Sequence, residues 1–84
     1  MVIKVSAQFE KHYKKLPLQV KEKAKERELL FRENPFHPQL KTHKLSGNNK
    51  GSWAFWVSYH IRIKFIFLDH EEILLLDIGT HNIY

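Results

Sequence analysis

Residues 61–68 alternate between apolar and polar side chains, and this pattern constrains the fold more than any other feature of the sequence. In an extended strand, successive side chains point to opposite faces. One face then carries Ile61, Ile63, Phe65 and Phe67, and the other carries Arg62 and Lys64. A strand with one apolar face needs a second layer that covers it. The alternation therefore predicts a sheet that is covered on one side and partly open on the side of the two cations.

The first half of the chain has a helical pattern. Residues 2–5 form a short apolar strand, and Ser6 is a suitable N-cap for a helix that follows it. Pro17 ends this helix and can occupy the first turn of the next one. Residues 18–33 are rich in strong helix formers, and the Asn-Pro pair at 34–35 stops them. We therefore expect a hairpin of two helices.

The second half of the chain is typical of strands. The predicted strands are residues 42–45, 53–57, 61–68 and 72–78, separated by turns at 46–51 and 69–71. The last of them is apolar on both faces, like a central strand, and Gly79 ends it. The order of one strand, two helices and four strands predicts an α+β fold. In this fold, two N-terminal helices pack on one face of a twisted antiparallel β-sheet.

The length of 84 residues predicts a single domain over residues 1–84. The longest apolar run, residues 73–76, is far shorter than the roughly 20 residues of a membrane-spanning helix. The first residues lack the apolar stretch of a secretory signal. Because the chain has no cysteine, disulfide scaffolds, thiolate nucleophiles and cysteine zinc sites are excluded. We expect a soluble, cytoplasmic protein that does not bind a membrane.

The positive charge is concentrated in one part of the chain. Residues 1–50 contain 12 basic and 5 acidic side chains, whereas residues 51–84 contain 2 basic and 4 acidic ones. A small basic domain of this kind favours a polyanionic partner such as a nucleic acid. The alternative is a protein that is merely basic and has no such partner.

The six histidines do not indicate a metal site. None of them forms an H-E-x-x-H or H-x-x-x-H pair, so neither a metal nor any other cofactor is expected. His81 nevertheless stands out, because it follows the last predicted strand directly after Gly79 and Thr80. A histidine at a strand end can transfer protons near neutral pH. The alternative is an ordinary surface histidine.

Two sets of basic residues could bind phosphate. They are Arg62 and Lys64 on one strand face, and Lys41, His43 and Lys44 before the glycine-containing turn. Trp56 is expected on the same strand face as Arg62, where an exposed ring can stack on an unpaired base. The alternatives are a solvated strand face, a solvated turn, and a tryptophan at the rim of the core or in a protein contact.

Six short segments of the sequence form a recognisable series. They are FEKHYKKLP at 9–17, NP at 34–35, HKLSG at 43–47, GSWAFWV at 51–57, YHIRIKF at 59–65 and LLDIGTHNIY at 75–84. In this order and spacing, they resemble the RelE/ParE toxin family of bacterial type II toxin–antitoxin modules, in particular its RelE/YafQ-like members. The resemblance covers nearly the whole chain. It implies the α+β fold described above and a cognate antitoxin that binds the toxin in a hetero-oligomer.

The resemblance also implies an activity. Many family members are metal-independent endoribonucleases, or mRNA interferases, which enter the ribosomal A site and cut mRNA by attack of a 2′-hydroxyl on the adjacent phosphate. By resemblance, the catalytic residues are Arg62 as phosphate stabiliser, His81 as proton-transfer group and Tyr84 as the residue that orients or stacks on the nucleotide. The expected RNA-binding residues are Lys41, His43, Lys44, Lys50, Trp56, His60 and Lys64.

The sequence departs from the family pattern at three places. Trp56 stands where members often carry a basic residue, so either stacking replaces charge or the phosphate site is weaker. No acidic residue matches the glutamate base of some branches, which leaves His81 or a lysine as the base. Many relatives also continue beyond the position of Tyr84. Two alternatives to the nuclease are a ParE-like DNA gyrase inhibitor without catalysis and a non-enzymatic basic RNA-binding module.

Overall fold

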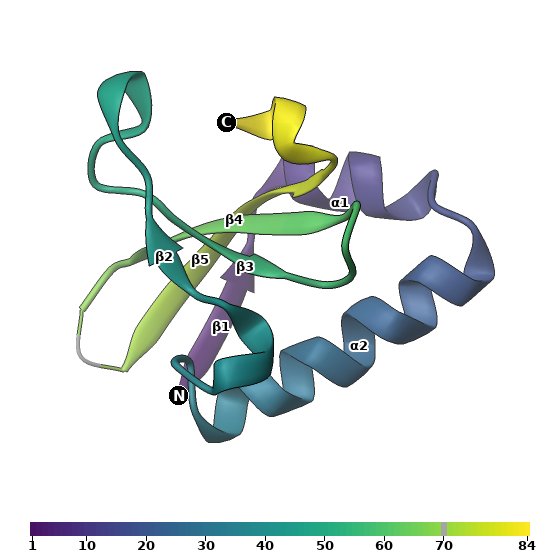
Figure 1. Ribbon diagram of the computed structural model, residues 1–84, viewed down its shortest axis with the longest axis horizontal. Helices are drawn as coiled ribbons and strands as arrows, with labels where there is room; N and C mark the ends of the chain where they lie inside the picture. The colour runs from purple at the N-terminus through teal and green to yellow at the C-terminus, as the bar shows by residue number, and fades with distance from the viewer. Residues whose placement is uncertain (70) are drawn as a thin grey trace.

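Five strands form one sheet in the order β1-β5-β4-β3-β2, and two helices pack against it (Figure 1). The structure is a computed structural model that describes residues 1–69 and 71–84. The elements are β1 (Val2–Val5), α1 (Ala7–Lys14), α2 (Leu18–Glu33), β2 (His43–Lys44), β3 (Trp53–Trp56), β4 (Arg62–Phe67) and β5 (Glu72–Gly79). Short 3-10 turns lie at Pro38–Leu40, Gly47–Asn49 and His81–Ile83. Within the described part of the chain, no helix is long and apolar enough to cross a membrane.

The predicted α+β fold is confirmed, with one difference in the direction of a strand. Strands β2 to β5 pair antiparallel, but β1 pairs parallel to β5, with Val2 opposite Glu72 and Val5 opposite Leu75. Parallel neighbours need a long crossover between them, and everything from α1 to β4 supplies it here. The sheet is therefore mixed, and β5 is a central strand between β1 and β4, as its apolar sequence predicts.

Each of the four strands predicted in the second half of the chain differs from the observed strand by one residue at one or both ends. Strand β2 covers only His43–Lys44 of the predicted residues 42–45. Gly79 is the last residue of β5 and does not lie outside it. The predicted turn at residues 69–71 includes His70, which lies outside the described residues.

The core forms where α2 crosses the covered face of the sheet. Phe31 of α2 is fully buried and stacks on Phe55 of β3, with ring centroids 4.6 Å apart. Its ring also meets the edge of Phe65 of β4 at 4.9 Å. Ile63 and Phe65 are buried, whereas Arg62 and Lys64 alternate with them, so the predicted division of β4 into two faces is confirmed.

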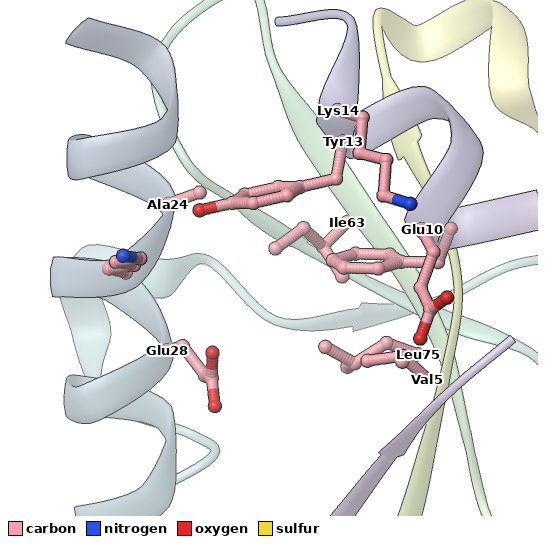
Figure 2. Close-up of a pocket in the computed structure, with 10 residues that line it drawn as sticks. Val5, Glu10, Tyr13, Lys14, Ala24, Glu28, Ile63 and Leu75 are labelled. Carbon is pink, nitrogen blue, oxygen red and sulfur yellow. The ribbon is translucent and has the colours of Figure 1, made fainter. Parts of the chain in front are cut away.

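An apolar groove remains open between the two helices. Phe9 and Tyr13 of α1 line it together with Ala24 of α2, and Ile63 and Leu75 form its floor (Figure 2). Charged side chains border the groove at Glu10, Lys14, Lys25 and Glu28. We call this feature, with a volume of about 280 Å³, the helix groove.

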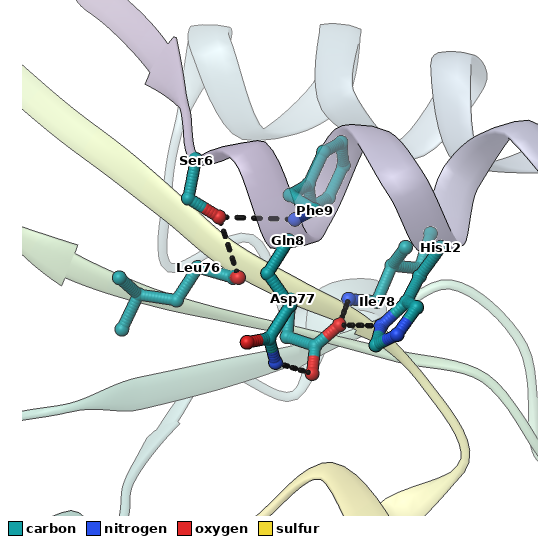
Figure 3. Close-up of polar contacts among 7 residues, drawn as sticks. All are labelled: Ser6, Gln8, Phe9, His12, Leu76, Asp77 and Ile78. Atoms are coloured by element: carbon teal, nitrogen blue, oxygen red, sulfur yellow. Dashed lines mark hydrogen bonds and ion pairs between the residues drawn. The ribbon is translucent and has the colours of Figure 1, made fainter.

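The far end of β5 binds α1 through a buried carboxylate. The register of β4 and β5 is irregular between Lys64 and Phe65, and Asp77 follows this irregularity. Asp77 is only 6% exposed, and its carboxylate accepts a hydrogen bond of 2.7 Å from Gln8 and lies 2.6 Å from Nδ1 of His12 (Figure 3). A buried carboxylate is tolerated when such donors satisfy it. Asp77 therefore fixes α1 against the strand.

Ser6 makes a second connection between α1 and β5. Its hydroxyl oxygen accepts a 3.0 Å hydrogen bond from the backbone N–H of Phe9, which confirms the predicted N-cap. The same hydroxyl donates to the carbonyl of Leu76 at 2.8 Å (Figure 3). One small side chain thus caps a helix and satisfies a carbonyl of the neighbouring strand.

We expect Ser6→Ala to lower the free energy of unfolding by about 1–3 kcal/mol, since it removes both the cap and the bond to the strand. Chemical denaturation measures this change. Ser46→Ala is the matched control, because Ser46 also precedes a short turn but makes no side-chain cap hydrogen bond. Equal stability of the two variants would contradict the double role of Ser6.

Candidate active site

Three segments that lie far apart in the sequence meet at one end of the sheet. Trp56 at the end of β3 pairs with Arg62 at the start of β4, and Arg62 in turn pairs with Gly79 at the end of β5. The chain after Gly79 forms the turn His81–Ile83, which brings His81 and Tyr84 to the same end. The pairing of the strands therefore gathers all three residues predicted to be catalytic.

Arg62 is held in a fixed position on the open face. Its guanidinium carbon lies 3.8 Å from the centre of the Trp56 ring, which is a close cation–π contact. Its Nη1 donates to the backbone carbonyls of Ser58 at 2.6 Å and Tyr59 at 2.7 Å. A guanidinium has five N–H donors, and these bonds use one of its nitrogens. The remaining donors can bind an anion such as phosphate.

A hollow of about 280 Å³ opens in front of this arginine, and we call it the Arg62 hollow. It is lined by Trp56, Tyr59, His60, Arg62, Thr80 and His81. Two imidazoles and a guanidinium therefore border one small space, which suits proton transfer next to a bound phosphate. In the described residues, no group of three or more His, Asp or Glu side chains could hold a metal ion.

Tyr84 and His43 border the site from the side of β2. Their rings lie 6.2 Å apart and nearly perpendicular. Burial raises the pKa of the Tyr84 phenol above its ordinary value of 10.0, and the positive charge of Arg62 opposes this increase. At neutral pH, the phenol is therefore protonated and can donate a hydrogen bond.

Gly79 allows the turn with His81 to fold back onto β5. A Cβ atom at this position would lie 2.8 Å from Cγ2 of Ile83, which is closer than van der Waals contact permits. The hydroxyl of Thr80 accepts a long hydrogen bond of 3.4 Å from the backbone N–H of Asn82. The absence of a side chain at Gly79 thus sets how closely the turn approaches the sheet.

Of the other predicted RNA-binding residues, Lys41 and Lys64 lie on the open side of the sheet with the Arg62 hollow, and Lys44 does not. Lys41 lies over the Trp56 ring at 5.3 Å, and Lys64 points from the open face to Asn49, to which it donates at 2.6 Å. Lys44, by contrast, lies over the ring of Trp53, because neighbouring residues of β2 face opposite sides. The structure therefore separates Lys44 from His43. Lys50 is exposed at the end of the turn Gly47–Asn49.

Three residues of the site, Ser58, Tyr59 and Thr80, were not predicted from the sequence to belong to it. The carbonyls of Ser58 and Tyr59 hold Arg62, but any residue type could supply a carbonyl at these positions. Thr80 stands out in the sequence only as a neighbour of His81, but it lines the Arg62 hollow itself. Tyr59 belongs to the aromatic segment 53–59, so its ring at the hollow agrees with the density of aromatic residues there.

Comparisons with known proteins place the whole chain beside toxins of one fold. No protein-family model matches the chain, and no curated protein matches it. The YoeB/ParE toxin from Agrobacterium tumefaciens is similar over 96% of this chain and 99% of its own, with a TM-score of 0.81 and 15% identity. YafQ from E. coli strain BL21(DE3) matches over 96% and 93%, with a TM-score of 0.80 and 25% identity. The E. coli DinJ-YafQ toxin-antitoxin complex contains a chain that matches over 96% and 92%, with a TM-score of 0.77 and 25% identity.

We expect the Tyr84 phenol to lose its proton above pH 10.0, since burial raises its pKa. Removal of the opposing charge in Arg62→Ala should raise this pKa further. The ultraviolet absorbance of phenolate, titrated in parallel with Tyr84→Phe, isolates the contribution of this one tyrosine. A pKa that falls in Arg62→Ala would contradict the proximity of the two side chains.

Proposed function

Because the chain belongs to the RelE/YafQ-like family of toxins, we propose that this toxin of a type II toxin–antitoxin module is an endoribonuclease that cleaves mRNA on the ribosome. The proposal rests mainly on one observation. Arg62, stacked on Trp56, and His81 line the same hollow, so a phosphate bound by the guanidinium lies beside a proton-transfer group. The site of action is then the cytoplasm, in the ribosomal A site, where mRNA is decoded.

The proposed reaction needs three kinds of group and no metal. The 2′-oxygen of one nucleotide attacks the adjacent phosphorus, and its proton passes to a base. The bond from phosphorus to the 5′-oxygen breaks, and that oxygen takes up a proton from an acid. The products are a 2′,3′-cyclic phosphate and a 5′-hydroxyl. Negative charge that develops on the phosphate oxygens must be stabilised by fixed donors.

The residues at the end of the sheet supply these groups. Arg62 stabilises the charge on the phosphate, since its side chain is already fixed by Trp56 and two carbonyls. His81 exchanges a proton with the 2′-oxygen or the 5′-oxygen. The protonated phenol of Tyr84 donates to the RNA or packs on a base, and His43 lies next to it.

The other basic residues bind the RNA around this centre. Trp56 offers an aromatic ring for stacking, and His60 borders the same hollow. Lys41, Lys64 and the exposed Lys50 supply positive charge on the open side of the sheet.

A cognate antitoxin is the expected protein partner. The helix groove is apolar at its floor and charged at its border, which suits apolar side chains of a partner that also carries charges. The antitoxin complexes known for two of the similar toxins, DinJ-YafQ and YoeB-YefM, support this assignment. We propose that the antitoxin inserts apolar side chains into the helix groove.

The nuclease proposal is tested by single-turnover cleavage of mRNA on programmed ribosomes, which separates the chemical step from binding and release. We expect Arg62→Ala to lower the rate about 10²–10³-fold, because it removes fixed charge at the phosphate. His81→Gln should lower the rate about 10²–10⁴-fold, because it removes a proton-transfer group beside the phosphate. Lys25→Ala is the control, since Lys25 is an exposed cation of α2 outside the Arg62 hollow.

Two outcomes would reject this mechanism. If both site variants cut at the rate of the unaltered protein, Arg62 and His81 do not perform the chemistry. If the unaltered protein arrests growth without loss of mRNA, and DNA supercoiling falls, the gyrase-inhibitor alternative replaces the nuclease.

The antitoxin proposal predicts that Val5→Glu weakens antitoxin binding at least tenfold, since it places a charge in the apolar helix groove. Val2→Glu is the matched control, because Val2 is also an exposed valine of β1 but lies outside the groove. Calorimetry with the protein encoded by the adjacent gene measures both affinities. An equal loss of affinity in the two variants would show that the antitoxin does not depend on this groove.

A further inference from the structure

A second hollow adjoins the Arg62 hollow on the other side of two shared aromatic residues. Its volume is about 450 Å³, and Trp56 and Tyr59 line both spaces. Its remaining walls include Arg27 of α2 and Lys41, together with Pro38 and Gln39 of the preceding turn. We call it the Arg27 hollow. Arg27 is not among the site residues expected from the sequence.

The charge of this hollow is positive and uncompensated. Two of its lining residues are cations, and none is acidic. The carboxylates nearest to Arg27 in the sequence are engaged elsewhere, because Glu26 pairs with Lys23 at 3.4 Å and Glu28 pairs with Arg32 at 3.0 Å. A concave surface with two cations and no carboxylate attracts an anion.

Arg27 has hydrogen-bonding capacity that the protein does not use. Its Nη1 donates to the side-chain oxygen of Gln39 at 3.1 Å, which holds the guanidinium at the wall of the hollow. Its Nε is buried without a hydrogen-bond partner among the described residues and is not accessible to a ligand, so the donors left for one are those of the two terminal nitrogens. Arginine binds phosphate through several donors at once, so a guanidinium with one bond to the protein is suited to a phosphate ligand.

Lys41 reaches the same space through an unusual backbone conformation. Its φ of 51° and ψ of 38° lie in the left-handed region, which is uncommon for a residue with a side chain. Its ammonium group lies 5.3 Å from the centre of the Trp56 ring. Arg62 contacts the same ring at 3.8 Å, so Trp56 connects the cations of the two hollows.

We propose that the Arg27 hollow binds the nucleotide that neighbours the scissile phosphate, with Arg27 and Lys41 on its phosphate and Trp56 or Tyr59 against its base. This inference rests on the proposed function, because it takes the Arg62 hollow as the site of cleavage. A single-stranded RNA suits the combination of two cations with two aromatic rings, since each nucleotide carries one phosphate and one flat base. The two hollows share a wall, so consecutive nucleotides of one strand can occupy them.

The test compares RNAs of two lengths that cannot be cleaved. Di- and tetranucleotides with 2′-O-methyl groups lack the attacking hydroxyl, and fluorescence anisotropy at one fixed salt concentration gives their affinities. The unaltered toxin should bind the tetranucleotide more tightly, because only the longer RNA fills both hollows. Arg27→Gln should reduce this gain about tenfold or more and leave dinucleotide binding nearly unchanged.

Two further variants make the comparison specific. Arg27→Lys keeps the positive charge and should restore part of the gain. Lys11→Gln removes one positive charge from an exposed position of α1, outside the helix groove and both hollows, and should leave the gain unchanged. Thermal unfolding of all variants confirms that each remains folded.

The results separate this inference from the proposed function. If Arg27→Gln weakens both RNAs by the same factor or weakens neither, or if the unaltered toxin gains nothing from the longer RNA, the Arg27 hollow is not a nucleotide site. If the length-dependent loss is found but the ribosome assay shows no mRNA cleavage, the hollow binds RNA and only the nuclease proposal fails.

Discussion

The packing of Phe31 against Phe55 and Phe65 fixes which side of the sheet can carry a functional site. All three rings are fully buried, and they join α2 to two neighbouring strands. Because side chains alternate along a strand, burial of these two strand residues forces Trp56 and Lys64 to the other face. The open face is therefore a consequence of the aromatic core, and alternation along the strands alone assigns Arg62 and Lys64 to that face.

Local patterns in the sequence are sufficient to predict the helices, the strands and the two faces of β4, because these depend on near neighbours. The parallel direction of β1 could not be predicted, since it depends on pairing with a strand about 70 residues away. The burial of Asp77 was missed for the same reason. Its donors Gln8 and His12 lie on α1, and no short-range pattern joins these residues to β5.

The candidate site was predictable where it follows strand alternation and not where it depends on helix packing. Arg62 lies near His81 and Tyr84 because β4 pairs with β5 and the turn that follows Gly79 carries the other two residues, and the family resemblance points to the same residues. Arg27 looks in the sequence like one more charge on a solvated helix. Its position in the Arg27 hollow, next to the Arg62 hollow, depends on how α2 lies across the sheet, and the order of residues in α2 does not specify this angle. The family resemblance predicts a basic residue at the position of Trp56. In the structure, the Trp56 ring instead contacts two cations from other segments, Lys41 and Arg62.

The parallel pairing of β1 with β5 has a consequence for the kinetics of folding. The two strands join opposite ends of the chain, so their contact requires closure of a loop of about 70 residues. Contacts of such long range slow folding, whereas the helical hairpin and the antiparallel strands β3 and β4 form from neighbouring segments. Ser6 and Asp77 secure α1 only after this closure. The chain therefore acquires its first helix in a stable position at a late stage, when the central strand is already in place.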